Sequence, residues 1–382
     1  MRYLFLFITL SVLQLSCSSS KNVQYNADPS IQLQQILEDG TTIENGITGI
    51  SLTVISPELD INFSNATGYD STEKKQALQV EQPFRIASLT KVFVATGILR
   101  LHEKSLLSIE DVISKHISQE HIDILRKGGY NPDNITIRHC LMHMSGLYDY
   151  AEGGPDYIEE ASKDPAKRWT RTEQIQFAMD HGKPQGAPGE IFHYSDTGYV
   201  LLGEIIERSL DTGLAEGLRS LLKFNELGMS STYLESLEER PVSLLPNVKR
   251  YMETIDASNW DNSIDLYGGG GLVSNTKDLT VFLQALFNGG IYEQEDTLPI
   301  MLLKKEYNGN EVPSQRLGFG SVTGKKSGLE VYLHSGFWGT FFMHIPKYNC
   351  SIAMNNTNDG DNNVLQQVID YVIWLGEQQS KP

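Results

Sequence analysis

Patterns of hydrophobic and polar residues predict strands at both ends of the chain. The segments from Ile47 to Ile55 and from Asp60 to Gly68 are strand-like, and Ser56-Pro57-Glu58 between them is typical of a turn. Toward the other end, strands are predicted at about 317–322, 329–334, 339–345 and 351–355. Because consecutive strands with short turns favour antiparallel pairing, we expect an antiparallel sheet.

Helical patterns dominate the middle of the chain, from Leu106 to about Arg250, where Gly and Pro interrupt them. Further helices are predicted at 88–103, from Thr136, and at 199–208, 276–288 and 363–378. We therefore expect an α/β (α+β) fold in which strands from both termini form one sheet flanked by helices. The α/β part would cover about 46–105 and 265–378 of a single domain at 46–378, with a mostly helical insertion at about 106–264.

The segment from Ile86 to Leu99 is apolar or small on every side and carries one charge, Lys91. This pattern predicts a buried helix. Ser88 lies three positions before Lys91, so the two side chains would share a helix face. Because burial disfavours a charged amine, Lys91 would be a base beside a nucleophilic hydroxyl. The alternative is a helix-capping serine followed by a lysine that extends to solvent.

The N-terminus is similar to an export signal, since Arg2 precedes a short apolar run from Leu4 to Leu15. The run is too short to span a bilayer as a stable helix. Leu15-Ser16-Cys17 resembles a bacterial lipoprotein processing site, although Gln14 stands where an aliphatic residue is usual. We expect residues 1–17 to be a signal peptide, Cys17 to be lipidated and residues 18–45 to be a tether. A plain secretory signal is the alternative.

Composition places this chain among large globular proteins, with 382 residues, 40% hydrophobic and 21% charged. The net charge of −17 argues against nucleic acid as a partner. The acidic residues from Asp149 to Glu160 are expected to form a solvated face. Cys140 and Cys350 lie in apolar surroundings, and no disulfide is predicted between them.

Two further strings carry candidate chemistry. Tyr194-Ser195-Asp196 follows a turn and precedes an apolar helix, which Asp196 could simply cap. His334-Ser335-Gly336-Phe337 ends one predicted strand, and its glycine permits the close backbone approach that an oxyanion site needs. Neither string is specific by itself.

Together, Ser-Leu-Thr-Lys at 88–91, Tyr-Ser-Asp at 194–196 and His-Ser-Gly at 334–336 resemble the motifs of the serine β-lactamase and penicillin-binding-protein superfamily. The similarity is to its branch of class C β-lactamases, D-Ala-D-Ala carboxypeptidases and related esterases. The segment 135–147, ending His-Met-Ser-Gly-Leu, Pro188-Gly189 and the segment 270–279 also resemble family segments. The resemblance covers roughly residues 45 to 375 and implies a β-lactamase/transpeptidase-like fold.

The resemblance also implies roles. Ser88 would be the acylated nucleophile, and Lys91 and Tyr194 would share proton transfer. The backbone N–H groups of Ser88 and Phe337 would form the oxyanion hole. Asp196, His334, Ser335 and Gly336 would bind substrate, and neither a cofactor nor a metal would be required.

Two of these positions depart from the family pattern. Asp196 stands where asparagine is usual, and an ionised carboxylate can only accept hydrogen bonds and would favour a charged Lys91. His334 replaces a lysine, and a neutral imidazole attracts a substrate carboxylate less strongly. Separately, His139 and His143 have the i, i+4 spacing of a zinc-binding helix, but the glutamate of that motif is missing because Cys140 stands in its place.

We predict an exported serine hydrolase of the periplasm or outer cell envelope, acting through an acyl-enzyme and touching membrane only through its lipid anchor. The expected substrate is a small molecule or a peptide with an acyl or D-Ala-type group, as for a D-alanyl-D-alanine carboxypeptidase-like or β-lactamase-related enzyme. The alternatives are an esterase on small acyl esters and an idle homologue that binds peptidoglycan or a protein partner. The oligomeric state is left open.

Overall fold

The computed structural model describes residues 24–41, 47–154, 156–252, 255–303, 306–307, 310–311, 316–323, 328–358 and 363–380. The predicted signal peptide and Cys17 lie outside these ranges. The helices are α1 (Pro29–Gly40), α2 (Thr90–Glu103), α3 (Gln119–Lys127), α4 (Ile137–Leu141), α5 (Asp156–Lys163), α6 (Arg171–His181), α7 (Asp196–Leu210), α8 (Leu214–Leu221), α9 (Thr276–Phe287), α10 (Thr297–Leu302) and α11 (Val364–Gln379).

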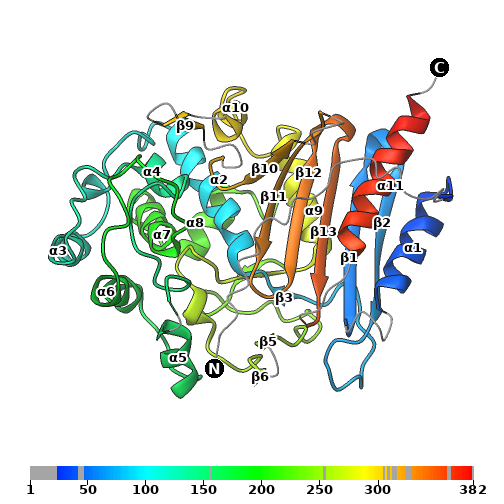
Figure 1. Cartoon of the computed structure of the whole chain (residues 1–382), viewed down its shortest axis with the longest axis horizontal. Coiled ribbons are helices and arrows are strands. Elements are labelled where there is room, and N and C mark those ends of the chain that lie inside the picture. The colour runs from blue at the N-terminus through cyan, green and yellow to red at the C-terminus, as the bar shows by residue number, and fades with distance from the viewer. Residues whose placement is uncertain are drawn as a thin grey trace.

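The main antiparallel sheet has the order β10 (Gly320–Thr323), β11 (Glu330–Gly336), β12 (Thr340–Ile345), β13 (Cys350–Asn356), β1 (Gly49–Ser56) and β2 (Ile61–Gly68). The last long strand pairs with the first, with Ile50 opposite Asn356 and Val54 opposite Ile352. The expected sheet built from both termini is therefore confirmed (Figure 1).

Alternate residues of the central strands face two separate cores, as the two-residue period of a strand requires. Ile50, Leu52 and Val54 of β1 belong to the core shared with α1 and α11. On the opposite face, the Thr53 hydroxyl donates to the Thr276 hydroxyl of α9 at 2.8 Å. With helices on both sides, nearly every residue of β1 is buried.

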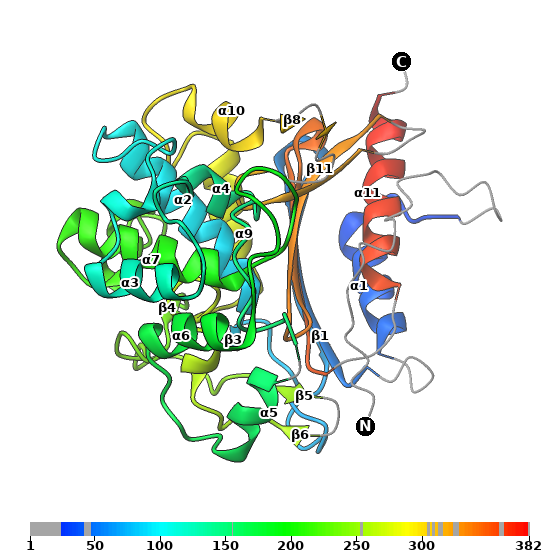
Figure 2. The ribbon, with the colours of Figure 1, turned by 60° about the vertical axis from the view of Figure 1, so that its left-hand side comes forward.

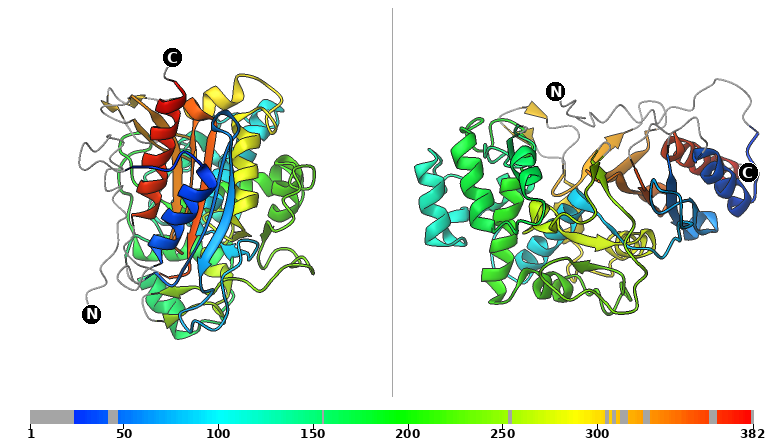
Figure 3. Two further views of the ribbon diagram at one scale, coloured as in Figure 1. Left: turned by 90° about the vertical axis from the view of Figure 1, so that its right-hand side faces the viewer. Right: turned by 90° about the horizontal axis from the view of Figure 1, so that it is seen from below.

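Helix α1 corrects the expected tether over residues 18–45. Asp28 caps this helix by accepting from the Ser30 backbone N–H at 2.9 Å. Leu33 and Leu37 are fully buried against the sheet, and α1 and α11 lie side by side across its outer face (Figures 2 and 3). The sequence Ile31-Gln-Leu-Gln-Gln-Ile-Leu37 places apolar residues at the spacing of one helix face. The segment is therefore an amphipathic helix, which its polar residues had led us to miss.

The inserted part between α2 and α9 is mostly helical, as expected, and α2 packs against α7 and α8. A small sheet was not predicted from the sequence, because its strands are very short. It has the order β3 (Phe84–Arg85), β7 (Leu272–Ser274) and β4 (Tyr233–Leu234). The remaining two-residue strands are β5 (Tyr251–Met252) with β6 (Ile255–Asp256), and β8 (Glu306–Tyr307) with β9 (Asn310–Glu311).

Within the described ranges, no helix combines the length and apolar character needed to cross a bilayer. Cys140 and Cys350, whose state the sequence left open, are buried free thiols.

Candidate active site

Ser88 lies in a single 3-10 turn, η3 (Ala87–Leu89), directly before α2. The helix was expected to begin at Ser88 itself, but its α-helical part begins two residues later. Ala87 has a φ of 47°, a left-handed conformation that is uncommon outside glycine and is often stored as strain at functional sites. This turn leaves the Ser88 side chain 8% exposed at the head of a buried helix.

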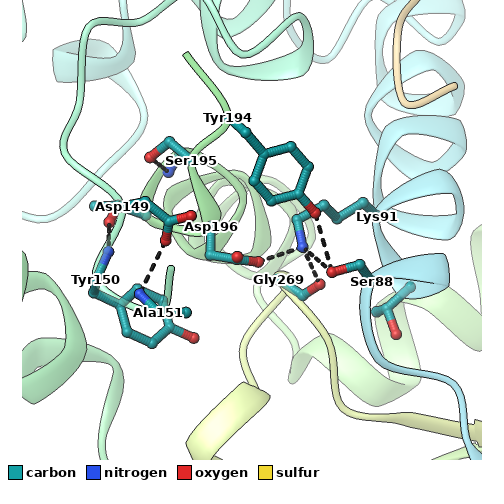
Figure 4. A network of polar contacts seen from close by, with 12 residues as sticks. Ser88, Lys91, Asp149, Tyr150, Ala151, Tyr194, Ser195, Asp196 and Gly269 are labelled. Atoms are coloured by element: carbon teal, nitrogen blue, oxygen red, sulfur yellow. Dashed lines mark hydrogen bonds and ion pairs between the residues drawn. The ribbon is translucent and has the colours of Figure 1, made fainter. Parts of the chain in front are cut away.

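Lys91 is fully buried in the first turn of α2 and points toward Ser88 (Figure 4). Its Nζ donates to Ser88 Oγ at 2.8 Å and to the Gly269 carbonyl at 2.7 Å, and it forms an ion pair with Asp196. Neither η3 nor α2 has a side-chain cap, so the alternative of a capping serine and a solvent-seeking lysine is wrong.

The charge of Lys91 differs from the first expectation of a neutral amine. Burial alone would lower the pKa of Lys91, but the charges of Asp196, Asp265 and Glu152 oppose it, and the pKa ends above its ordinary value. Lys91 is therefore an ammonium in the resting site, because the fold supplies the counter-ion that its own segment lacks.

Tyr194 completes a triangle of polar groups, since its Oη donates to Ser88 Oγ at 3.0 Å. Burial raises the pKa of Tyr194 well above its usual value, and the negative charges of Asp196 and Glu152 raise it further. The phenol thus holds its proton in the resting site. The residues predicted to act on Ser88 from two distant segments are brought together here.

The segment from Cys140 to Leu147 packs against Tyr194 through His143. The His143 ring stacks on the Tyr194 ring with centroids 4.2 Å apart, and its Nδ1 accepts from the Ser195 backbone N–H at 3.0 Å. His139 instead accepts from the Thr136 backbone N–H and helps to cap α4. The two histidines of the zinc alternative therefore serve different backbone sites, and no metal-ligating group of three or more His, Cys, Asp or Glu is found among the described residues.

Asp196 is the first residue of α7, and Ser195 rather than Asp196 caps this helix by accepting from the Gly198 backbone N–H. The alternative that Asp196 simply caps this helix is therefore wrong, and its carboxylate pairs with Lys91 instead. Asp149, expected on a solvated face, is only 2% exposed and also lies beside this group (Figure 4). Sequence patterns missed Asp149 and Asp265, because nothing in their spacing distinguishes them from surface acids.

The end of β11 lies against the Ser88 turn. A Cβ added to Gly336 would meet the Ile86 carbonyl at 2.4 Å and Thr340 Oγ1 at 2.3 Å, and Thr340 Oγ1 donates to that same carbonyl at 3.0 Å. Glycine is therefore required for this approach. It brings the backbone of Phe337, the next residue, close to the nucleophile turn.

His334 belongs to the same strand end, and Ser335 beside it is partly exposed. His334 Nδ1 lies 2.7 Å from the Ser335 carbonyl, which can only accept, so Nδ1 is the protonated nitrogen. Burial, with the nearby Lys91 charge, lowers the pKa of His334 to about 4. The imidazole is thus neutral near pH 7, and its Nε2 carries an acceptor lone pair.

Comparisons with known proteins show the family and the fold. A family model described as Beta-lactamase matches residues 33–377. Penicillin-binding protein 4* of Bacillus subtilis is 27% identical over 306 residues, which are 76% of this chain and 63% of that protein. The chain thus spans less than two thirds of that relative's length.

Solved structures show the same fold. D-amino acid amidase from Ochrobactrum anthropi, complexed with L-phenylalanine amide, superposes with a TM-score of 0.73 at 25% identity over 91% of this chain and 98% of that one. A penicillin-binding protein homologue from Pyrococcus abyssi, described as octameric, has a TM-score of 0.70 at 22% identity over 90% of this chain and 77% of its own.

Proposed function

Because the chain belongs to the Beta-lactamase family of serine hydrolases, we propose that it cleaves amide or ester bonds through an acyl-enzyme on Ser88. One observation carries the proposal: Lys91 Nζ and Tyr194 Oη both lie within hydrogen-bonding distance of Ser88 Oγ. A hydroxyl held between two proton-transfer groups is the arrangement that an activated nucleophile needs.

The contacts support the following proton path. Lys91 as an ammonium cannot accept a proton, so it first passes one to Asp196, its ion-pair partner. The neutral amine then takes the proton of Ser88 as Oγ attacks the carbonyl carbon. Tyr194 gives its proton to the leaving nitrogen or oxygen as that bond breaks, and Lys91 returns a proton to Tyr194. Water attacks the acyl-enzyme by the reverse sequence and frees Ser88.

The oxyanion of the tetrahedral intermediate would be held by the backbone N–H groups of Ser88 and Phe337. The packing of Gly336 against Ile86 supports this proposal, because it fixes the strand end beside the nucleophile turn. Donors fixed before reaction stabilise developing charge without reorganisation. His334 and Ser335 then flank the bound acyl group.

For the substrate, we propose an amide bond next to a D-configured residue. The D-amino acid amidase from Ochrobactrum anthropi, which has the same fold, supports this class. The carboxypeptidase-like activity predicted from the sequence is one form of it. Small acyl esters are the second candidate, since the same Ser88 attack cleaves them and an ester needs less help from the proton of Tyr194. The Ser88–Lys91–Tyr194 contacts argue against an idle binding protein.

A labelling experiment tests the nucleophile. The protein is incubated with a fluorophosphonate and with a fluorescent penicillin, and intact mass is measured. We expect Ser88→Ala to lose all label and to cost more than the roughly 10²–10³-fold in rate typical of losing one oxyanion donor. Ser162→Ala, at an exposed serine of α5, is the control and should label like wild type. Stoichiometric labelling of Ser88→Ala would refute the assignment.

We also propose that the protein is exported and anchored through lipidated Cys17, as predicted from the sequence. Fractionation should place the wild type with membranes, and Cys17→Ser should release it or stall its processing. If the mature wild-type protein is wholly soluble in the periplasm, the lipid anchor is refuted and the alternative of a plain secretory signal remains.

A further inference from the structure

The candidate proton-transfer residue Tyr194 lies outside any helix or strand. The segment 182–195 that carries it is described throughout and contains no regular element between α6 and α7. Ile191 and Phe192, shortly before Tyr194, are 42% and 41% exposed. Because loops are more mobile than helices and strands, contacts from another segment are needed to hold the phenol 3.0 Å from Ser88 Oγ (Figure 4).

The segment 143–146, which follows α4, accepts hydrogen bonds from the backbone of this loop. The Gln185 N–H donates to the Gly146 carbonyl at 2.9 Å. Further along the loop, the Gly189 N–H donates to the Met144 carbonyl at 2.7 Å. Hydrogen bonds between two segments limit the motion of both, so the middle of the loop is held against the residues that follow α4.

His143 makes the next contacts, and these lie on both sides of Tyr194. Its carbonyl accepts from the His193 backbone N–H at 2.8 Å, and its Nδ1 accepts from the Ser195 backbone N–H at 3.0 Å. Between these two bonds the His143 ring stacks on the Tyr194 ring, with centroids 4.2 Å apart and 23° between the planes. One residue therefore fixes the backbone before Tyr194, the backbone after it, and its ring.

His143 itself is held firmly and in the protonation state that these contacts need. It is 4% exposed, and the Tyr199 ring of α7 packs on its ring with centroids 5.0 Å apart. Burial, with the nearby Lys91 charge, lowers the pKa of His143 well below its usual value. The imidazole is therefore neutral, and an unprotonated Nδ1 can accept the Ser195 N–H. Its φ of 55° lies in the left-handed region, which histidine and asparagine adopt more readily than most residues.

We propose that His143 is a positioning residue for Tyr194, holding the phenol where its proton can pass to the leaving group as the acyl-enzyme forms. This inference rests on the proposed acyl-enzyme at Ser88. As the bond from the carbonyl carbon to the leaving atom breaks, that atom takes the Oη proton, and Lys91 returns a proton to Tyr194. His143 neither gains nor loses a proton, so it acts only through Tyr194.

Esters that share one acyl group and differ in the leaving group test the proposal, because kcat/KM reports the steps up to acylation. A misplaced phenol should cost most where the leaving oxygen is basic. We expect His143→Ala to lower kcat/KM about ten-fold or more for phenyl acetate, but less than about three-fold for p-nitrophenyl acetate, whose leaving group needs little help from a proton. A loss of folded enzyme would lower both values by one factor, so equal losses would overturn the proposal.

Two further variants calibrate this comparison. His143→Asn keeps a residue that tolerates the left-handed backbone and an acceptor oxygen for the Ser195 N–H, but it has no ring. If thermal unfolding shows that His143→Ala does not fold, His143→Asn provides the same comparison, with a smaller expected difference between the two esters. His181→Ala is the control, because this exposed histidine at the end of α6 also stacks on an aromatic ring, that of Phe177, with centroids 3.8 Å apart. It should leave both values unchanged.

A double-mutant cycle shows whether His143 acts through the phenol. Tyr194→Phe keeps the stacked ring and removes the proton. In that background, His143→Asn should change kcat/KM for phenyl acetate by less than about two-fold, because the group that it positions is gone. A loss as large as in the wild-type background would mean that His143 has only a structural role, and the proposal would be wrong.

Labelling of Ser88 separates this proposal from the proposed function. If a fluorophosphonate does not label Ser88, the acyl-enzyme itself is refuted. If Ser88 is labelled but the acetates turn over too slowly to measure, labelling rates with p-nitrophenyl and phenyl esters of one alkylphosphonate give the same comparison of leaving groups. Equal effects of the His143 variants on both rates would then refute the positioning role alone.

Discussion

At the scale of single residues, the proposed proton transfer depends on the ion pair between Lys91 and Asp196. Both side chains are almost completely inaccessible, at 0% and 3% exposure. A buried ion pair is strongly destabilised when one partner is removed, unless the remaining group can become neutral. Lys91 can become neutral by losing a proton, and the neutral amine is the form that can accept the proton of Ser88.

Replacing Asp196 with asparagine should therefore change the pH dependence. Without the carboxylate the pKa of Lys91 falls, so the acid limb of the pH–rate profile should move down by about one pH unit or more. The asparagine also supplies a donor and removes a negative charge, so acylation by penicillins and amides should rise. Kinetics of one ester and one β-lactam from pH 5 to 9 measure both effects.

The competing view of Asp196 makes a different prediction. If the ion pair is required to hold Lys91 in place, Asp196→Asn should lower activity and melting temperature together, with no shift of the acid limb and no new reactivity toward penicillins. Thermal unfolding of the two proteins, measured alongside the kinetics, distinguishes the outcomes.

At the scale of elements, the site depends on one strand end packed against one turn. β11 ends at Gly336, which opposes Thr340 of β12 in the sheet register. The turn η3 that carries Ser88 contacts both strands. The sheet therefore positions Phe337, the candidate oxyanion donor at the end of β11, beside the Ser88 turn. Helix α2 carries Lys91 and the segment directly before α7 carries Tyr194, the two candidate proton-transfer groups.

Substituting Gly336 tests this arrangement. In Gly336→Ala the new methyl group would overlap the Ile86 carbonyl and Thr340 Oγ1, so the strand end must move away from Ser88. We expect a loss of roughly 10²–10³-fold in kcat and about 1–3 kcal/mol of stability. Gly213→Ala is the control, because Gly213 has an ordinary φ of −69° and no atom within 4 Å of the added Cβ. Near-normal kcat in Gly336→Ala would argue against the oxyanion assignment.

At the scale of the whole molecule, the candidate site lies between two parts of the structure, which are built from distant segments of the chain. The sheet part supplies His334 and Phe337, and the helical insertion supplies Asp149 and Tyr194. Gathering several acids around one lysine costs stability, because desolvation and mutual repulsion disfavour their charged forms. Asp265 should therefore lower the stability of the folded protein where its carboxyl group is ionised.

Neutralising Asp265 should stabilise the protein in a pH-dependent way. Its pKa is about 7 in the folded protein against 3.8 for the free side chain. Between these two pKa values the folded state binds more protons than the unfolded state. The free energy of unfolding therefore falls as pH rises from about 4 to 7, and the whole penalty is present above pH 7. Asp265→Asn removes that penalty. We expect its gain to be small at pH 4 and roughly 1–2 kcal/mol at pH 8.

Urea denaturation at the two pH values measures this gain. Glu239→Gln, at an exposed acid, should show no comparable change between them. An Asp265→Asn gain that is equal at pH 4 and pH 8 would show that the effect comes from packing and not from charge.

The sequence by itself determined the features that rest on local pattern. Strand alternation and turn residues predicted β1, β2 and β10 to β13 with boundaries within a few residues, and apolar periodicity predicted α2, α7, α9 and α11. Three short motifs, in order, predicted that Ser88, Lys91 and Tyr194 would meet. It failed at α1, because the polar stretch from Ser18 to about Ser30 suggested a tether that was extended to residue 45. The stabilisation of this helix comes from the sheet face that it covers.

Only the tertiary structure decided the electrostatics of the site. Lys91 has no counter-ion in its own segment, and its charge depends on Asp196, Asp265 and Glu152, which lie far away in the chain. Asp149 was indistinguishable from a surface acid in the sequence, and its burial depends on how the loop after α4 packs against α7. Desolvation and Coulomb interactions act through space, so they depend on which segments the fold brings together and not on the order of residues along the chain.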